Sequence, residues 1–150
     1  MINTPIVGRT IEVALVASAP VTIPVGGSIP FNVTTLNTTR VRDCRGCSQE
    51  VCRLIPTSGR VRIRARAVYN VDVNINSAAS ATDVLTVTDN EGQDKSFALT
   101  GSTQISCSLL IEENRGSISV INNGTAPLVL TPTATNTALP LADMRIVIGR

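Results

Sequence analysis

The sequence predicts an all-β protein that folds as one domain, and three observations support this prediction. Residues 60–76 carry an apolar or aromatic side chain at every odd position, from Val61 to Ile75. Successive side chains of a strand point to opposite faces, so these odd positions should face a core. Eight prolines and ten glycines are spread along the 150 residues, and no uninterrupted helical stretch remains. Val, Ile, Leu and Ala have to fill the core, because the chain has no Trp, one Tyr and two Phe.

The first half of the chain contains short predicted strands and one long alternating segment. Residues 10–18 alternate and begin the sheet, and the flanking prolines make residues 21–23 an edge strand. Residues 29–33 follow the Gly26-Gly27 turn as another strand. Residues 34–39 are expected to be a polar loop, and residues 40–53 are the least strand-like part of the chain. The segment 60–76 is either a strand pair or one long bent strand.

The second half shows regular alternation between short strands and turns. A hairpin is predicted from residues 84–88 and 96–100 around a polar turn at 89–94. Further strands are expected at 103–112, 117–121, 127–134 and 143–148. About nine or ten evenly spaced strands are typical of a β-sandwich or jelly roll. We therefore expect a domain over residues 10–150, preceded by an N-terminal arm at residues 1–9.

Charge is distributed unevenly along the chain. Residues 40–66 hold eight arginines against Asp43 and Glu50, a balance of +6, and residues 67–143 hold eight acids against Lys95 and Arg115, a balance of −6. Folding could interleave these segments and neutralise them within one subunit. Alternatively, the arginines form a basic face for a neighbouring subunit or an acidic surface.

Several classes of function are not expected. The chain has no histidine, which excludes Ser-His-Asp, Cys-His and His-metal sites. No glycine-rich loop precedes a helix, and the adjacent Glu112 and Glu113 should point to opposite faces of a strand. We therefore expect no enzymatic activity and no cofactor. No segment is long and apolar enough to span a bilayer, and residues 13–17 are too short for a signal-peptide core.

The cysteines leave several interpretations open. Cys44 and Cys47 have the C-x₂-C spacing of zinc ligands and Cys52 could be a third ligand, although structural zinc sites usually have four. A disulfide within residues 44–52 and three free thiols are equally compatible with the sequence. Cys107 lies on an alternating apolar face, where it is expected to be a small buried hydrophobe. The expected core around it includes Tyr69, Val71 and Val73.

Four arginines form a second candidate site. If residues 60–66 are one strand, Arg60, Arg62, Arg64 and Arg66 project from one face at intervals of about 7 Å. This docking face could bind a capsid lattice, a polyanionic glycan or nucleic acid. Nucleic acid is the least expected of these, because stacking aromatic residues are almost absent. A solvated face that is partly paired with acids on a neighbouring strand is the alternative.

Several segments resemble, in order, the C1q/tumour-necrosis-factor-like jelly-roll domains that form the heads of bacterial collagen-like surface proteins. The similarity covers most of the chain from Val25 onward and consists of Val25–Asn32, Gly59 with Tyr69–Asn74, Val84–Val87 with the Asn90–Gly92 turn, and Leu139–Ile148. The sequence departs from this pattern at Val68, where glycine is usual, and in the cysteine segment. Its opening residues Met1–Val7 also resemble small virion structural proteins of tailed phages and prophages.

The resemblance implies a homotrimer without catalytic activity. The expected function is a capsid-decoration or head-fibre type protein of a virion, which binds a capsid or other virion protein. The alternatives are a receptor- or glycan-binding head on a phage or bacterial cell surface, and a free-standing C1q-like binding module. The protein would be made in the cytoplasm of a bacterial host, with no membrane partner.

Overall fold

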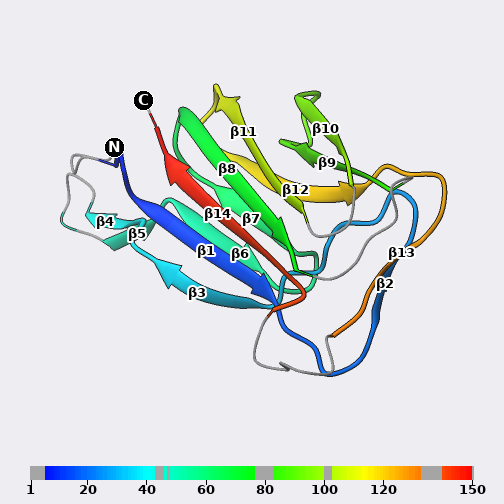
Figure 1. The fold of residues 1–150 in the computed structure, drawn as a ribbon. Helices are drawn as coiled ribbons and strands as arrows, with labels where there is room; N and C mark the ends of the chain where they lie inside the picture. Colours follow the sequence, from blue (N-terminus) through cyan, green and yellow to red (C-terminus); the bar gives the residue numbers. More distant parts are fainter. Residues whose placement is uncertain are drawn as a thin grey trace.

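The computed structural model describes residues 6–42, 46, 48–76, 83–99, 103–132 and 140–149. All regular secondary structure in these ranges is β-strand (Figure 1). The strands are β1 (Thr10–Leu15), β2 (Val21–Ile23), β3 (Val33–Asn37), β4 (Arg40–Arg42), β5 (Ser48–Glu50), β6 (Cys52–Ile55), β7 (Arg60–Ile63), β8 (Ala67–Ile75), β9 (Val84–Thr88), β10 (Asp94–Ala98), β11 (Thr103–Ile111), β12 (Gly116–Asn122), β13 (Leu128–Leu130) and β14 (Ala142–Ile148).

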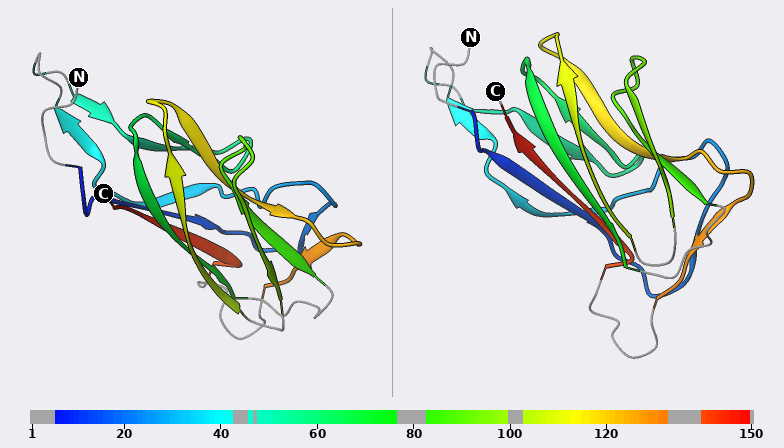
Figure 2. Two further views of the ribbon diagram at one scale, coloured as in Figure 1. Left: turned by 90° about the horizontal axis from the view of Figure 1, so that it is seen from above. Right: turned by 45° about the horizontal axis from the view of Figure 1, so that its top comes forward.

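Two five-stranded antiparallel sheets form a sandwich (Figures 1 and 2). The strand order is β11-β8-β14-β1-β3 in the first sheet and β10-β9-β12-β7-β6 in the second. Two small two-stranded sheets, β13-β2 and β4-β5, lie beside them. The described ends of the chain meet, because the Gly8 amide donates to the Ile148 carbonyl at 2.7 Å. No helix long and apolar enough to span a membrane is present in the described part of the chain.

The long alternating segment crosses from one sheet to the other. β7 ends at Ile63 in the second sheet, and β8 begins at Ala67 in the first. The odd positions stay inward through the crossing, since every odd residue from Val61 to Ile75 is buried. The segment is therefore the predicted strand pair, and it lines both walls of one core.

Three predictions about the first half of the chain are wrong. Residues 29–32 of the predicted strand 29–33 do not form a strand, because Pro30 has no N–H for a ladder, although Ile29 and Phe31 are fully buried. The predicted polar loop contains most of β3, an edge strand whose first four residues, Val33 to Leu36, are exposed. The segment described as least strand-like contains β4 and β5. As a result, the described residues form fourteen strands where about nine or ten were expected.

The second half follows the prediction closely. β9 and β10 form the expected hairpin, with Thr88 opposite Asp94 in the register. β11, β12 and β14 match the expected strands to within one or two residues. Of the predicted strand 127–134, the described part forms strand at Leu128–Leu130, which is β13 and pairs with the edge strand β2.

Gly59 connects two of the sequence motifs that carry the family resemblance. Its backbone has a φ of +70°, and a Cβ there would overlap the carbonyl oxygen of Ile29 and approach the amide nitrogen of Phe31 to 2.9 Å. Residues 29–31 therefore lie directly against the turn that precedes β7. This contact requires glycine for both the backbone conformation and the space.

Candidate functional site

The four arginines of the predicted docking face do not lie on one strand. Arg60 and Arg62 belong to β7, whereas Arg64 and Arg66 lie in the connection between β7 and β8. The expected spacing along a single strand is therefore wrong beyond Arg62. Arg60, Arg64 and Arg66 are exposed and Arg62 is half-buried.

Arg53 joins this group through the sheet register. It lies on β6 directly opposite Arg62, with Ser117 of β12 on the other side of Arg62. Like charges directly opposite one another destabilise a sheet pair. Within the described residues, none of the guanidinium groups of Arg53, Arg62 and Arg64 forms an ion pair.

Arg62 is the most perturbed of these groups. Its Nε atom is buried and has no hydrogen-bond partner in the described structure. Burial lowers the pKa of the Arg62 guanidinium, and the charges of Arg64 and Arg53 lower it further. Glu50 acts in the opposite direction but is already bound, because one of its carboxylate oxygens lies 2.8 Å from Arg40. Arg62 therefore has a side-chain donor that could bind an external acceptor.

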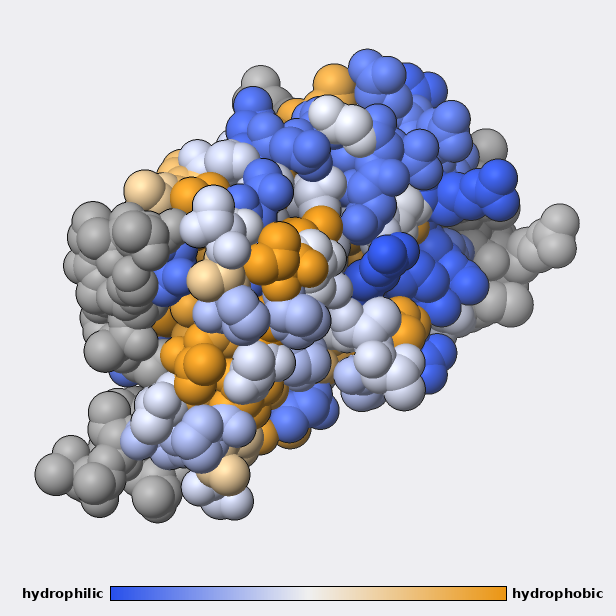
Figure 3. Space-filling model, turned by 90° about the vertical axis from the view of Figure 1, so that its right-hand side faces the viewer, coloured by the Kyte–Doolittle hydropathy of each residue, from blue (hydrophilic) through white to orange (hydrophobic). Residues whose placement is uncertain are grey.

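A cleft of about 1010 Å³ lies beside Arg62, at the end of the sandwich where three chain segments meet. The end of β7 provides Arg62, and Arg64 follows directly after this strand. The β9–β10 turn provides Asp89 and residues 91–93. The end of β11 and the turn to β12 provide residues 110–113, 115 and 116. In Figure 1 the tips of β10 and β11 stand at the top of the molecule. Figure 3 shows that hydrophilic residues dominate the upper part of the side that carries β10.

Gln93 fixes the β9–β10 turn to the end of β11. Its side-chain oxygen accepts a hydrogen bond from the Leu110 amide at 3.0 Å, and its side-chain nitrogen donates to the Leu110 carbonyl. The same nitrogen donates to Asp89 Oδ2 at 2.9 Å, and Asp89 Oδ1 accepts from the Glu91 and Gln93 amides at 2.8 and 3.0 Å. Asp89 is thus occupied within its own turn, and the cleft is preformed.

The other acids of the cleft are free. Glu91, Glu112 and Glu113 are exposed, and their carboxylates form no ion pair or side-chain hydrogen bond among the described residues. Arg115, which also lines the cleft, is exposed. The cleft therefore presents guanidinium groups and carboxylates that do not neutralise one another by direct contact.

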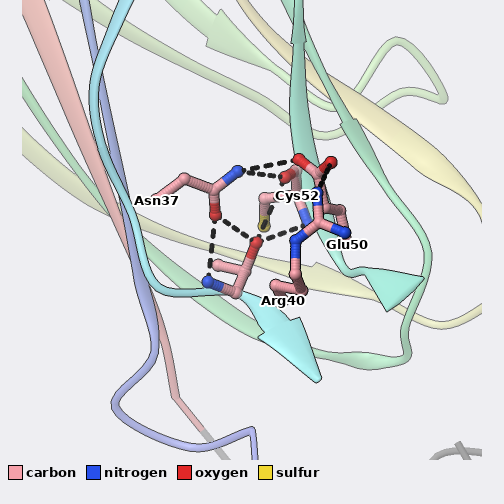
Figure 4. Close-up of polar contacts among 5 residues, drawn as sticks. Asn37, Arg40, Glu50 and Cys52 are labelled. Atoms are coloured by element: carbon pink, nitrogen blue, oxygen red, sulfur yellow. Dashed lines mark hydrogen bonds and ion pairs between the residues drawn. The ribbon is translucent and has the colours of Figure 1, made fainter. Parts of the chain in front are cut away.

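A second polar group, shown in Figure 4, links β3 to β5 and β6. The Asn37 amide donates to Glu50 Oε2 at 3.1 Å and to the Cys52 carbonyl at 3.0 Å. Thr39 Oγ1 accepts from the Cys52 amide at 3.0 Å and lies 2.6 Å from Asn37 Oδ1. Thr39 is completely buried. These bonds satisfy one another, so the group holds strands together and leaves no site for a ligand.

Of the three candidate zinc ligands, the structure describes Cys52. Cys44 and Cys47 lie outside the described residues. Cys52 is a free, fully buried thiol, and burial raises its pKa to about 12 despite the hydrogen bond with Thr39. A thiol with such a pKa is a poor nucleophile and metal ligand. Among the described residues, no group of three or more His, Cys, Asp or Glu side chains is arranged to hold a metal.

The predicted core residues lie on the inner face of the first sheet. Tyr69, Val71 and Val73 are buried, and the Tyr69 hydroxyl donates to the Ala65 carbonyl at 2.6 Å. Burial raises the pKa of this phenol. Cys107 is a free thiol that packs against the core but is only half-buried, and burial raises its pKa.

Sequence reasoning missed Arg53 and the acidic side of the cleft. Arg53 is separated from Arg62 by the β6–β7 turn, and only the strand register shows that the two are opposite. The cleft is formed by three turns that are distant in the sequence. The sequence places Glu112 and Glu113 next to each other but gives no sign that they line the same cleft as Arg62 and Arg64.

A comparison with one solved structure agrees with this topology. The chain is similar to the structure of Eiger TNF from S. frugiperda, with a TM-score of 0.61 and 13% sequence identity, over 94% of this chain and 92% of that one. It also matches Podospora anserina GH26-CBM35 β-(1,4)-mannanase at a TM-score of 0.40 and 15% identity, over 89% of this chain and 28% of that one. The sequence matches no protein-family model and no curated protein. The chain thus has the TNF/C1q-like jelly-roll fold that its sequence motifs indicated.

Proposed function

We propose that this protein is a non-catalytic structural protein of a virion, assembled as a homotrimer and acting as a capsid-decoration or head-fibre subunit of a tailed phage or prophage. The observation that supports the proposal best is the TNF-like jelly roll, whose similarity to a solved TNF covers 94% of the chain. The resemblance of residues Met1–Val7 to small virion proteins adds the particle context.

The outer face of the first sheet suits burial against another copy of the chain. Its polar groups bond to each other across the strands: Ser106 with Asp72 at 2.5 Å, Ser108 with Asn70 at 2.7 Å, and Asn74 with Asp143 at 2.8 Å. Arg145 on this face lies 3.4 Å from Glu12. Because these charges and amides are already partnered, covering them would leave few groups unsatisfied.

The basic face, formed by Arg60 and Arg62 on β7 and by Arg64 and Arg66 in the β7–β8 connection, lies beside the second sheet. It would remain outside such a trimer. Arg60, Arg62, Arg64 and Arg66 would then be available to dock on an acidic capsid surface. Contacts of this kind between exposed charges weaken as salt concentration increases.

Co-sedimentation with capsids tests the proposal. The capsids would be assembled from the major capsid protein encoded in the same genome, and binding would be measured at about 0.1 M and about 1 M salt. We expect salt-sensitive binding that is lost when all four arginines are changed to Ser. The matched control is Lys95→Ser, which removes an exposed cation from β10, at the opposite edge of the same sheet, and should bind normally. If the unchanged protein does not bind capsids, the proposed capsid role is wrong. If the quadruple variant binds as well as the unchanged protein, the four arginines are not the docking face.

A glycan-binding head is the second candidate, and the cleft beside Arg62 favours it. A preformed cleft with unpaired hydrogen-bonding groups is what a small polar ligand requires.

A further inference from the structure

The size and charge of the cleft restrict the ligands that could occupy it. Its volume of about 1010 Å³ is at the upper end of the roughly 300–1,000 Å³ found for small-molecule sites. The lining residues include Arg62, Arg64 and Arg115 on the one hand and Glu91, Glu112 and Glu113 on the other. A ligand that fills this space must therefore satisfy both cations and carboxylates.

The cationic side needs an anion. No side-chain N–H group of Arg62 or Arg64 forms a hydrogen bond within the described residues, and Arg62 faces the like charge of Arg53 across the ladder. A carboxylate or similar oxyanion placed here would relieve the repulsion and accept charge-assisted hydrogen bonds from the guanidinium groups.

The acidic side excludes a long polyanion. A nucleic acid or an acidic peptide that ran through the cleft would bring further negative charges against Glu91, Glu112 and Glu113. The lining also lacks aromatic side chains on which bases could stack. Hydroxyl groups, in contrast, donate readily to carboxylates. The ligand should thus combine one anionic group with several hydroxyls.

We propose that this cleft binds an acidic saccharide, whose anionic group is held by Arg62 and Arg64 and whose hydroxyl groups donate to Glu91, Glu112 and Glu113. Leu110, which is 45% exposed and lines the cleft, offers an apolar surface to the C–H groups of the sugar. The bonds between Gln93 and Leu110 hold the β9–β10 turn against the end of β11 before the ligand arrives, which reduces the ordering cost of binding. This site does not depend on the virion role or on the trimer.

Titration calorimetry with sialyllactose, a trisaccharide that carries a single carboxylate, tests the proposal, with its methyl ester as the uncharged matched ligand. We expect the acid to bind with a dissociation constant below about 1 mM, and the ester to bind about tenfold more weakly because the charge-assisted bonds are lost. Uronic and sialic acid monosaccharides extend the panel. If no acidic sugar in the panel binds at about 10 mM, or if the ester binds as well as the acid, the proposal is wrong.

Two variants separate the proposed ligand from an acidic protein partner. Arg62→Met keeps the aliphatic stem but removes the charge, so it should reduce sialyllactose affinity about tenfold or more. Its thermal stability should be equal to or above that of the unchanged protein, because a charge unpaired in the fold has been removed. The double variant Glu112→Ala/Glu113→Ala should weaken binding of the sugar.

The same double variant gives the opposite result for a polyanion. Hexaglutamate should bind weakly to the unchanged protein, and more tightly once the two acids are removed. If hexaglutamate binds the unchanged protein as tightly as the sugar does, or if the double variant improves sugar binding, an acidic protein partner replaces the saccharide. Arg60→Ser/Arg66→Ser changes residues outside the cleft lining and should leave sugar binding intact, which separates this site from capsid docking.

Discussion

Replacement of Gly59 by alanine should be among the most damaging small changes in the chain. Gly59 has a φ of +70°, and L-residues pay about 1–2 kcal/mol in this left-handed region. The added Cβ would also overlap the Ile29 carbonyl and lie 2.9 Å from the Phe31 amide nitrogen. Both contacts are with backbone, so no side-chain rotation can relieve them, and the overlap should add about 1–3 kcal/mol. The expected loss of unfolding free energy is about 2–5 kcal/mol.

Gly26→Ala is the matched control for this substitution. Gly26 has a φ of +82°, but a Cβ there would meet no heavy atom within 4 Å. Only the conformational cost of about 1–2 kcal/mol should therefore remain. Urea unfolding monitored by circular dichroism would measure both variants. The account predicts a clearly lower midpoint for Gly59→Ala, and equal midpoints for the two variants would refute the packing of residues 29–31 against this turn.

Three further predictions concern buried polar groups. Asn122→Ala should lower the free energy of unfolding by about 2–4 kcal/mol, because the fully buried Asn122 side chain forms hydrogen bonds with backbone groups of two chain segments. Its neighbour Asn123 is exposed, so Asn123→Ala should have little effect in the same urea titration. Tyr69→Phe should cost about 1 kcal/mol in thermal unfolding, since the Ala65 carbonyl loses its buried donor; an unchanged midpoint would contradict this. Between about pH 9 and about pH 12 the Cys52 thiol stays protonated in the folded protein but is deprotonated in the unfolded chain. The free energy of unfolding should therefore fall as pH rises through this range, and less steeply in Cys52→Ala. Equal dependence on pH in the two proteins would show that this thiol is not responsible.

The alternation of residues 60–76 predicted the inner face of both sheets because burial on a strand depends only on side-chain parity. The position at which this segment changes sheets depends on the packing of the two sheets, and nothing local marks residues 64–66 as a crossing. β3 was missed for a related reason. An edge strand that is exposed on both sides needs no apolar residues, so its Thr-rich sequence resembles a loop.

The candidate site was harder to predict than the fold. Arg62 was identified because arginines at alternate positions share a face of a strand. Its neighbour Arg53 and the acids of the cleft come from other segments, and only the register and the turn geometry bring them together. Cys52 shows the same limit: the sequence made it a possible third ligand beside Cys44 and Cys47, whereas its inward position on β6 buries the thiol.

The homotrimer is the claim on which the proposed function depends most directly, and its mass in solution tests it. The chain has a mass of 15.8 kDa. Native mass spectrometry or light scattering at micromolar concentration should give a particle of three times this mass. A stable species of 15.8 kDa under the same conditions would contradict the account.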